Sequence, residues 1–200
     1  MGIGGNNYYK NCYVDLKESC LRSETTVKVF DQMRKLQSYT DEGSPGRDWN
    51  VATGMVIEGK AGFQIMGDWA KGEFTAAGKV PGVDYYCAPT PSNNGYLYNV
   101  DSFIFYKTSD PEKQEGQKLL AKLMMGKNFQ KVFNLYKGSI PARLDVPMDE
   151  FDKCAKTSNS DIKTAGASGG LVPSFAHGMA QGNTMKAALQ DIITEHFNSD

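Results

Sequence analysis

The chain has 200 residues, of which 40% are hydrophobic and 22% are charged, and its formal net charge is −1. This composition is typical of a globular protein of one domain or two small ones. It offers no basic field, so a nucleic-acid partner is not expected. No apolar run reaches the roughly 20 residues that a membrane-spanning helix needs, and the start, MGIGGNNYYKNC, lacks the signal-peptide pattern.

The first sixty residues are predicted to be mostly helical. The stretch 24–39, ETTVKVFDQMRKLQSY, repeats apolar side chains at the three-residue spacing of an amphipathic helix. A short helix or helix end is expected at 8–20, and a further helix at 49–59. The Pro- and Gly-containing stretch DEGSPGRD separates the second of these helices from the third.

A tryptophan follows a short apolar run at 60–67, KAGFQIMG, which is typical of a buried strand. Gly67 is expected to let the backbone turn, and Asp68 is expected to cap a short helix that starts at Trp69. Taken alone, Trp69 fits two interpretations. It is either a core residue beside a turn or an aromatic surface held out for a ligand.

The rest of the chain is predicted to alternate strands with helices. Strands are expected at 84–91 and 99–107, followed by helices at 111–125 and 128–137. The remaining segments are interpreted as an acidic helix (148–156), a polar Gly-rich stretch (155–170) and a closing amphipathic helix (185–197). This alternation places the chain in the α/β class. About three strands is few for an α/β domain of this length, which suggests a part of something larger.

The sequence carries no recognisable catalytic or metal-binding motif. The four cysteines form no CxxC pair and are not near the two histidines, so no metal or cofactor is expected. GASGG does not match the GxSxG motif, and no loop matches a nucleotide-binding pattern. The chain is therefore not expected to be an enzyme. Acid pairs such as Asp149 and Glu150 leave one alternative, a paired-carboxylate hydrolase acting on sugars.

Four side chains lie where predicted elements begin, end or turn, as ligand contacts do in α/β proteins. Trp69 follows a turn, Asp101 begins a strand, Lys137 ends a helix, and His177 lies between a proline and a glycine. An aromatic face can stack on a sugar ring, while the three polar groups can bond its hydroxyls. Each residue also has an ordinary interpretation: a core side chain, a strand cap, a solvated lysine and a loop histidine.

Several segments occur in an order that resembles one protein family. They are RDWN, VIEGKAGFQIMGDWAKGEF, NVDSFIFYK, FNLYKGSIPAR with the FD and C that follow it, and AHGMA. In this order they resemble the bacterial extracellular solute-binding proteins of family 1, and most closely the periplasmic glucose/mannose-binding proteins that serve ABC sugar importers. The resemblance extends from about residue 8 to the end of the chain.

The resemblance implies a periplasmic-binding-protein-like type II fold, in which two α/β lobes joined by a hinge close on one sugar. It covers the C-terminal half of such a protein only, so a partial fold is expected. Residues 1–84 and 144–200 would form the second lobe, and 85–143 would be a return segment of the first. That segment would lack its sheet partners and leave apolar surface uncovered.

The family's sugar contacts carry over to five positions. Trp69 matches the stacking tryptophan of the second lobe, and Trp49 matches a second aromatic residue in the cleft. Asp101, Lys137 and His177 match the hydroxyl-binding acid, lysine and histidine. These assignments favour the ligand-binding interpretation of each residue over the ordinary one.

The resemblance also bears on the cysteines. Cys87 and Cys154 match positions that are cysteines in close relatives, which implies a disulfide that an oxidising periplasm would permit. Cys12 and Cys20 have no counterpart, and their pairing stays open.

The implied function is capture of a monosaccharide, glucose or a related aldohexose, for delivery to the membrane subunits of an ABC importer. The implied location is the periplasm, although the chain shows no signal peptide. A second hypothesis is that the chain is a truncated fragment that no longer binds sugar on its own and acts at most as an interaction module.

Overall fold

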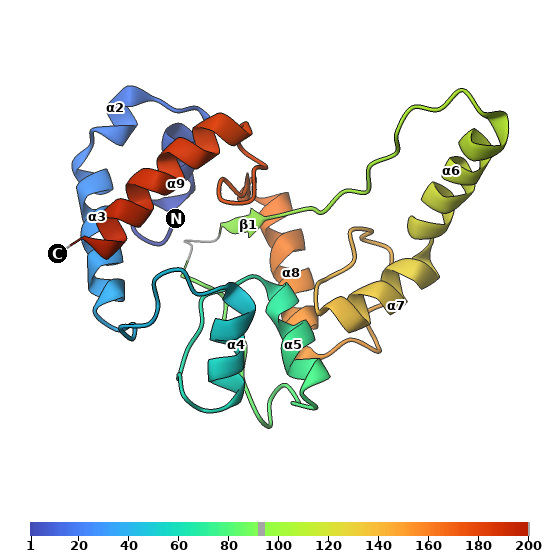
Figure 1. Cartoon of the computed structure of the whole chain (residues 1–200), viewed down its shortest axis with the longest axis horizontal. Coiled ribbons are helices and arrows are strands. Elements are labelled where there is room, and N and C mark those ends of the chain that lie inside the picture. The colour runs from blue at the N-terminus through green and yellow to red at the C-terminus, as the bar shows by residue number, and fades with distance from the viewer. Residues whose placement is uncertain (92–94, 200) are drawn as a thin grey trace. The chain divides into compact units, whose positions relative to one another are not determined.

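Helices dominate the computed structural model of the chain, which describes residues 1–91 and 95–199 (Figure 1). The chain divides into two compact units. The first comprises Met1–Arg47, Pro89–Asn99 and Asp161–Asp200, and the second comprises Asp48–Ala88 and Val100–Ser160. These boundaries differ from those of the expected lobe segments (1–84, 85–143 and 144–200), which refer to a complete two-lobed protein and stay a prediction.

The first unit is built from short helices and a small sheet. Its elements are α1 (Gly5–Tyr9), a π-helical turn (Lys10–Val14), α2 (Glu18–Leu21), α3 (Glu24–Gln37), β1 (Tyr96–Tyr98), β2 (Leu171–Pro173) and α9 (Asn183–Asn198). The two strands pair in parallel with Leu97 opposite Val172. Tyr9, Val172 and Phe175 form the core around this sheet, so the sheet is held by apolar packing as well as by backbone hydrogen bonds.

Two predicted helices of this unit are confirmed. Ser23 caps α3, since its hydroxyl accepts a hydrogen bond from the N–H of Thr26, as expected of a serine before an amphipathic run. α3 packs against α9, where the rings of Phe30 and His196 meet edge to face with centroids 4.9 Å apart. A disulfide joins Cys12 to Cys20, which answers the open question about this pair.

The second unit contains most of the predicted site residues. Its elements are α4 (Trp49–Ile57), a 3-10 turn (Asp68–Ala70), α5 (Lys71–Ala76), α6 (Pro111–Met124), α7 (Lys127–Lys137) and the first part of α8 (Lys153–Ala167). Asp110 caps α6 by accepting from the N–H groups of Glu112 and Lys113, with Pro111 in the first turn. The core of the unit consists of Val146, Phe151 and Ala155.

The three predicted strands at 60–67, 84–91 and 99–107 are wrong, because the structure shows no strand in these segments. Within the described residues, the nearest feature is an isolated bridge between Pro81 and Tyr85. A strand forms only when a neighbouring strand takes up its backbone hydrogen bonds. Here the apolar side chains stand in solvent instead, and Phe63 is 96% exposed. Figure 1 shows the residues before α6 as a long trace without an arrow.

The stretch at 155–170, interpreted from the sequence only as polar and Gly-rich, is mostly helical in the structure. It lies mostly in α8, which starts at Lys153 rather than at 148 and runs to Ala167. The buried residues of this helix are Ala155, Asn159 and Ala165. Small and polar residues therefore carry its buried face, which hides the helical spacing from an apolar pattern.

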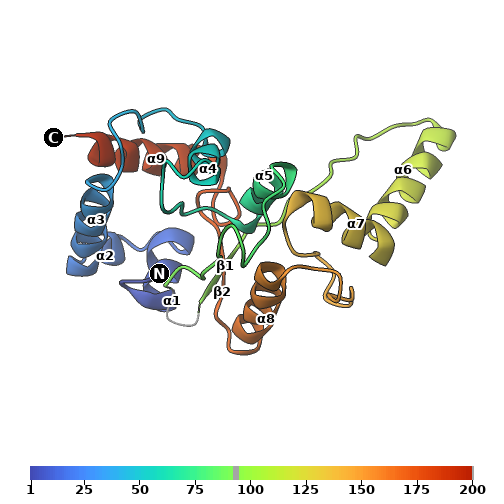
Figure 2. The same cartoon turned by 90° about the horizontal axis from the view of Figure 1, so that it is seen from below.

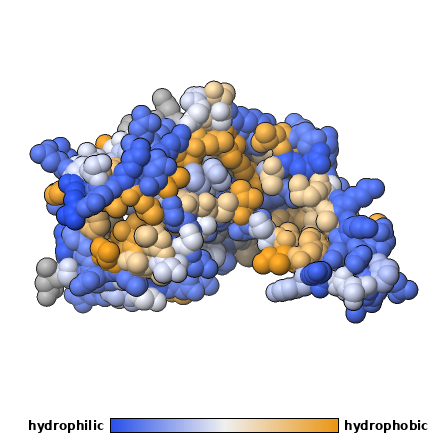
Figure 3. Space-filling view, turned by 90° about the horizontal axis from the view of Figure 1, so that it is seen from above, coloured by the Kyte–Doolittle hydropathy of each residue, from blue (hydrophilic) through white to orange (hydrophobic). Residues whose placement is uncertain are grey.

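The fold class is a helix-rich α/β arrangement with a small sheet, consistent with a partial solute-binding protein. None of the described helices is both long and apolar enough to span a bilayer. Figure 3 shows apolar residues at several places on the surface among hydrophilic ones.

Candidate functional site: the junction of α5 and α7

Trp69 lies in the 3-10 turn that leads into α5 and is half-buried. Its indole ring folds back over Gly67, so that a Cβ atom at position 67 would overlap the ring. Gly67 itself is extended, with a φ of −69°, a conformation open to any residue. The glycine therefore makes room for the indole, and the expectation that it serves to turn the backbone is wrong.

Asp68 does not cap the helix, which corrects a second expectation. Its carboxylate instead accepts a hydrogen bond from the backbone N–H of Ile140, 3.2 Å away, in the loop after α7. Burial raises the pKa of Asp68 above its ordinary value, against the opposing effect of Lys71 and of the Ile140 N–H. The residue thus ties the turn that carries Trp69 to a segment some seventy positions away in sequence.

The segment before Trp69 is anchored by a side chain rather than by a strand. The Gln64 amide donates to the Trp49 carbonyl oxygen at 2.9 Å, and the Thr53 hydroxyl lies 2.8 Å from Oε1 of Gln64. Thr53 is fully buried in α4, so this contact holds the segment against the helix. Trp49, the first residue of α4, has its side chain at the surface.

Helices α5 and α7 pack against each other (Figure 2). Two glycines allow their backbones to approach closely. A Cβ atom on Gly72 would lie 2.8 Å from the Lys137 carbonyl oxygen, and one on Gly138 would lie 2.6 Å from the Gly72 nitrogen. Gly138 also has a φ of +87° and ends α7, a position that favours glycine. The motifs MGDWAKGEF and LYKGSIPAR therefore pack directly against each other, which explains why both contain a glycine.

Lys137 and Asp101, two of the predicted hydroxyl-binding residues, form an ion pair. Lys137 is the last residue of α7, and its ammonium also lies 5.7 Å from the centroid of the Phe133 ring. Asp101 comes from the extended segment before α6. The structure thus brings Lys137, Asp101 and the turn of Trp69 to one junction of the second unit, where Lys137 also lowers the pKa of Asp68 as a minor effect.

His177 belongs to the first unit. Its Nδ1 lies 2.7 Å from the Ser174 hydroxyl, and Ser174 is only 2% exposed. The Ser174 N–H in turn donates to the carbonyl oxygen of Tyr98 in β1. A buried residue tied to the sheet therefore orients an imidazole at the surface, which suits a hydrogen bond to a ligand.

Sequence reasoning missed a buried ion pair beside the junction. The ammonium of Lys71 lies 2.6 Å from Oδ2 of Asp152, and Lys71 is 6% exposed. The other carboxylate oxygen, Oδ1, accepts from the N–H of Ala155 in the first turn of α8. Both residues lie inside motifs that carry the family resemblance, DWAK and FD. This was the only feature of the sequence that could have drawn attention to them.

The disulfide between Cys87 and Cys154 is present and lies next to this ion pair in sequence. Nearby, the Tyr85 ring stacks on Phe74 with centroids 4.2 Å apart. Burial raises the pKa of Tyr85 to about 12, and the charge of Asp152 adds to the effect. The start of α5 and the start of α8 therefore form one packed region together with the loop that holds Cys87.

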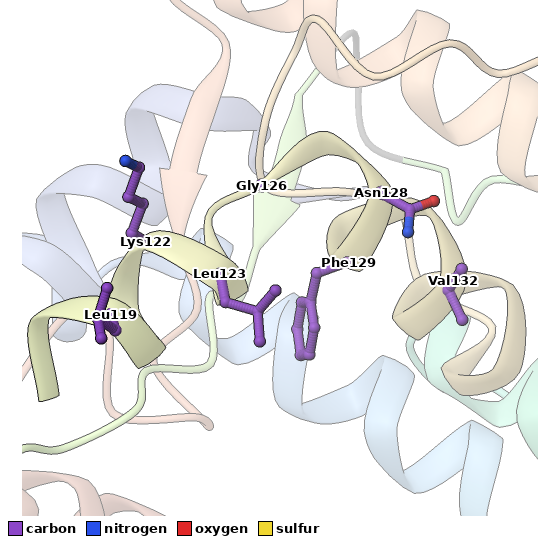
Figure 4. Close-up of a pocket in the computed structure, with 7 residues that line it drawn as sticks. All are labelled: Leu119, Lys122, Leu123, Gly126, Asn128, Phe129 and Val132. Atoms are coloured by element: carbon purple, nitrogen blue, oxygen red, sulfur yellow. The ribbon is translucent and has the colours of Figure 1, made fainter. Parts of the chain in front are cut away.

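A hollow lies between α6 and α7, with a volume of about 540 Å³ (Figure 4). Its lining is mainly apolar, and Figure 4 shows Leu123 and Phe129 side by side within it. Such a lining offers few partners for hydroxyl groups, so it does not suit a sugar. No group of three or more potential metal ligands occurs within residues 1–91 and 95–199.

The chain is similar to known binding proteins over most of its length. The family described as "Bacterial extracellular solute-binding protein" matches residues 7–166. A "Probable sugar-binding periplasmic protein" of Brucella suis is 46% identical over 97% of this chain and 46% of its own. A protein of the same description from Rhizobium meliloti is 44% identical over 98% of this chain and 47% of its own.

A more distant relative is an uncharacterized ABC transporter extracellular-binding protein of Pyrococcus horikoshii, 32% identical over 98% of this chain and 43% of its own. The chain thus spans about half the length of the curated relatives it matches. These relatives are described as binding proteins rather than enzymes. With the family match covering most of its residues, the chain belongs to the bacterial extracellular solute-binding proteins.

Proposed function

We propose that this chain contributes to a sugar-binding site of a solute-binding protein that serves an ABC importer in the periplasm. The ligand we propose is a monosaccharide, glucose or a related aldohexose. The observation that carries the proposal is the α5–α7 junction, where Asp68, the neighbour of Trp69 in the chain, accepts a hydrogen bond from the loop after α7, and where Lys137 at the end of α7 pairs with Asp101. The names of two relatives support this proposal: "sugar-binding periplasmic protein" supports a sugar as the ligand, and "ABC transporter extracellular-binding protein" supports an ABC transporter as the partner.

The junction supplies the groups that a sugar ring requires. The indole of Trp69 offers a flat apolar face for the C–H groups of a pyranose. The carboxylate of Asp101 accepts hydrogen bonds from hydroxyls, and the ammonium of Lys137 donates them. Trp49 and His177 are proposed as further contacts. Binding would act by shifting the protein toward a closed form that the importer's membrane subunits recognise, without a chemical step.

A second candidate function is supported by the apolar surface of the second unit. On this view the 200-residue chain does not hold sugar by itself and acts at most as an interaction module. Apolar residues exposed in the segment before α6, including Phe103 and Ile104, favour this view, since large exposed apolar patches mark contact surfaces.

A thermal melt with and without millimolar glucose, mannose and galactose separates the two. Sugar binding to the folded chain raises the melting temperature as the concentration exceeds Kd. Trp69→Ala should abolish this shift, whereas Phe63→Ala, which removes an exposed aromatic residue of the same segment, should retain it. If no sugar moves the melt of the parent chain, the second candidate is favoured. If both variants respond like the parent, Trp69 is not the stacking residue.

A further inference from the structure

Trp69 is linked to the disulfide of the second unit by a short sequence of contacts. Lys71 follows Trp69 by two residues and bonds Asp152 at 2.6 Å. Cys154 follows Asp152 by two residues and is joined to Cys87. Lys71 is therefore close in sequence to Trp69, and Asp152 is close in sequence to the disulfide-bonded Cys154.

In this ion pair the lysine is buried away from solvent, and the aspartate accepts a further hydrogen bond from the backbone of α8. The Lys71 side chain is 8% exposed and that of Asp152 is 34% exposed. Burial would raise the pKa of Asp152, but the hydrogen bonds from Lys71 and from the Ala155 N–H outweigh it and hold the pKa below its ordinary value. A buried charge whose partner is removed is costly, so these two residues hold their relative position firmly.

We propose that Lys71 and Asp152 are positioning residues for Trp69: their ion pair fixes the start of α5 to the start of α8, which the Cys87–Cys154 disulfide anchors. This inference rests on the proposed function, since it takes Trp69 as the sugar-stacking face. Gly72 and Asp68 hold the same turn against the end of α7. The Trp69 turn is thus held from two sides, by the end of α7 and by the start of α8.

The first test uses the fluorescence of Trp69 in the ligand-free chain. A Trp49→Phe background leaves Trp69 as the only tryptophan, because the chain has two. Asp152→Asn keeps Oδ1 available to cap α8 but removes the charge that Lys71 needs. We expect the Trp69 emission to shift to longer wavelength and iodide quenching to increase. Emission and quenching equal to those of the parent would overturn the proposal.

The matched control is Glu150→Gln. Glu150 lies two residues before Asp152 and pairs with Lys131 at 2.7 Å, nearly the same distance, but its side chain is 64% exposed. The same isosteric change should leave Trp69 as it is in the parent. An equal response of Trp69 to both changes would also overturn the proposal, because the buried pair would then have no special role.

A second variant keeps the test valid if Asp152→Asn does not fold. Lys71→Met combined with Asp152→Asn removes both charges and leaves no buried ion without a partner, a change that proteins often tolerate. The folded double variant should show the same shift in Trp69 emission. Unchanged emission in this variant would mean that packing alone positions the tryptophan.

The disulfide provides an independent arm. Replacing Cys87 and Cys154 by serine should alter Trp69 emission, whereas replacing Cys12 and Cys20, which are joined in the first unit, should not. If neither pair of cysteine replacements changes the Trp69 emission, the Cys87–Cys154 disulfide does not help to position Trp69, and the proposal fails as stated.

Sugar affinity is measured separately in the tryptophan-containing chain. If the parent binds sugar, Asp152→Asn should raise Kd by about tenfold, and an unchanged Kd would overturn the positioning role. If the parent binds no sugar, the proposed function fails for this chain, while the Trp69 emission still decides whether the ion pair positions the residue. The two failures are therefore distinguishable.

Discussion

Two regions of the second unit both contain apolar side chains but differ in how these side chains are packed. Around the α5–α7 junction, glycines allow backbones to touch, and buried polar groups such as Lys71 and Gln130 are bonded. In the segment 100–107, five apolar or aromatic side chains are exposed and the backbone joins no strand. The difference teaches that a hydrophobic pattern specifies structure only where the chain also supplies a neighbouring segment for it to pack against or pair with.

The largest loss of stability should come from removing a disulfide. Removing the Cys87–Cys154 link, with a sequence separation of 67, should lower the free energy of unfolding by about 4 kcal/mol in the chain-entropy estimate. Removing Cys12–Cys20, with a separation of 8, should cost about 2.5 kcal/mol. Urea denaturation of the two serine double variants measures both values, and the reverse order would contradict the estimate.

The close approach of α5 and α7 can be broken by one methyl group. Gly138→Ala places a Cβ 2.6 Å from the Gly72 nitrogen at a φ of +87°, and we expect a loss of about 3 kcal/mol. Gly82 is the control, since it has a φ of +86° and nothing within 4 Å. Gly82→Ala should cost only about 1 kcal/mol. Equal losses in urea denaturation would mean that backbone conformation, rather than contact, requires Gly138.

The two acids beside Lys71 should respond to pH in opposite directions. The pKa of Asp152 is lowered, so its contribution to stability is complete above the ordinary aspartate pKa and is lost as the pH falls through the lowered value. The pKa of Asp68 is raised, so its ionisation reduces stability as the pH rises through the raised value.

Denaturation curves between about pH 3 and pH 7 test this pair of signs. Asp152→Asn should flatten the acid-side loss of stability, whereas Asp68→Asn should steepen the rise of stability with pH. We expect the change for Asp152→Asn to be no more than about 1 kcal/mol across this pH range, because Asp152 is partly exposed and solvent screens its charge. The same slope change in both variants would contradict the opposite shifts.

The smallest effect is expected in the exposed segment. Replacing Phe103 and Phe105 by serine should change the free energy of unfolding by no more than about 0.5 kcal/mol. The reason is that Phe103 is 57% exposed and Phe105 is 40% exposed. Solubility should increase, because less apolar surface is available for association. Phe151→Ser is the opposite case, as Phe151 is 4% exposed, and it should destabilise the chain strongly. A large loss of stability from Phe103 and Phe105 would show that the segment packs in solution.

The helices could be predicted from sequence because their signals are local. Caps at Ser23 and Asp110 and the apolar spacing of 24–39 lie within a few residues of what they specify. The absence of strands at 60–67 and 99–107 could not be predicted, because whether a strand forms depends on a partner that the segment itself does not contain. Most of α8 was not predicted, because its buried face consists of alanine and asparagine side chains.

The candidate site was found by resemblance more than by pattern. Nothing local in LYKGSIPAR shows that Lys137 meets Asp101, because that contact joins residues 36 positions apart. The roles of Gly67 and Asp68 were misjudged for the same reason: each acts on an atom outside its own turn, the Trp69 ring and the Ile140 N–H. Lys71 was overlooked since a lysine is ordinarily expected at the surface.

The ion pair of Lys137 and Asp101 has a consequence for the water around the site. The lysine side chain is 30% exposed and the aspartate 64% exposed, so each group has already exchanged part of its hydration shell for the other. In the folded chain the lysine side chain is therefore less accessible to water than the aspartate side chain. A ligand arriving there would displace water mainly from the outer side of the aspartate.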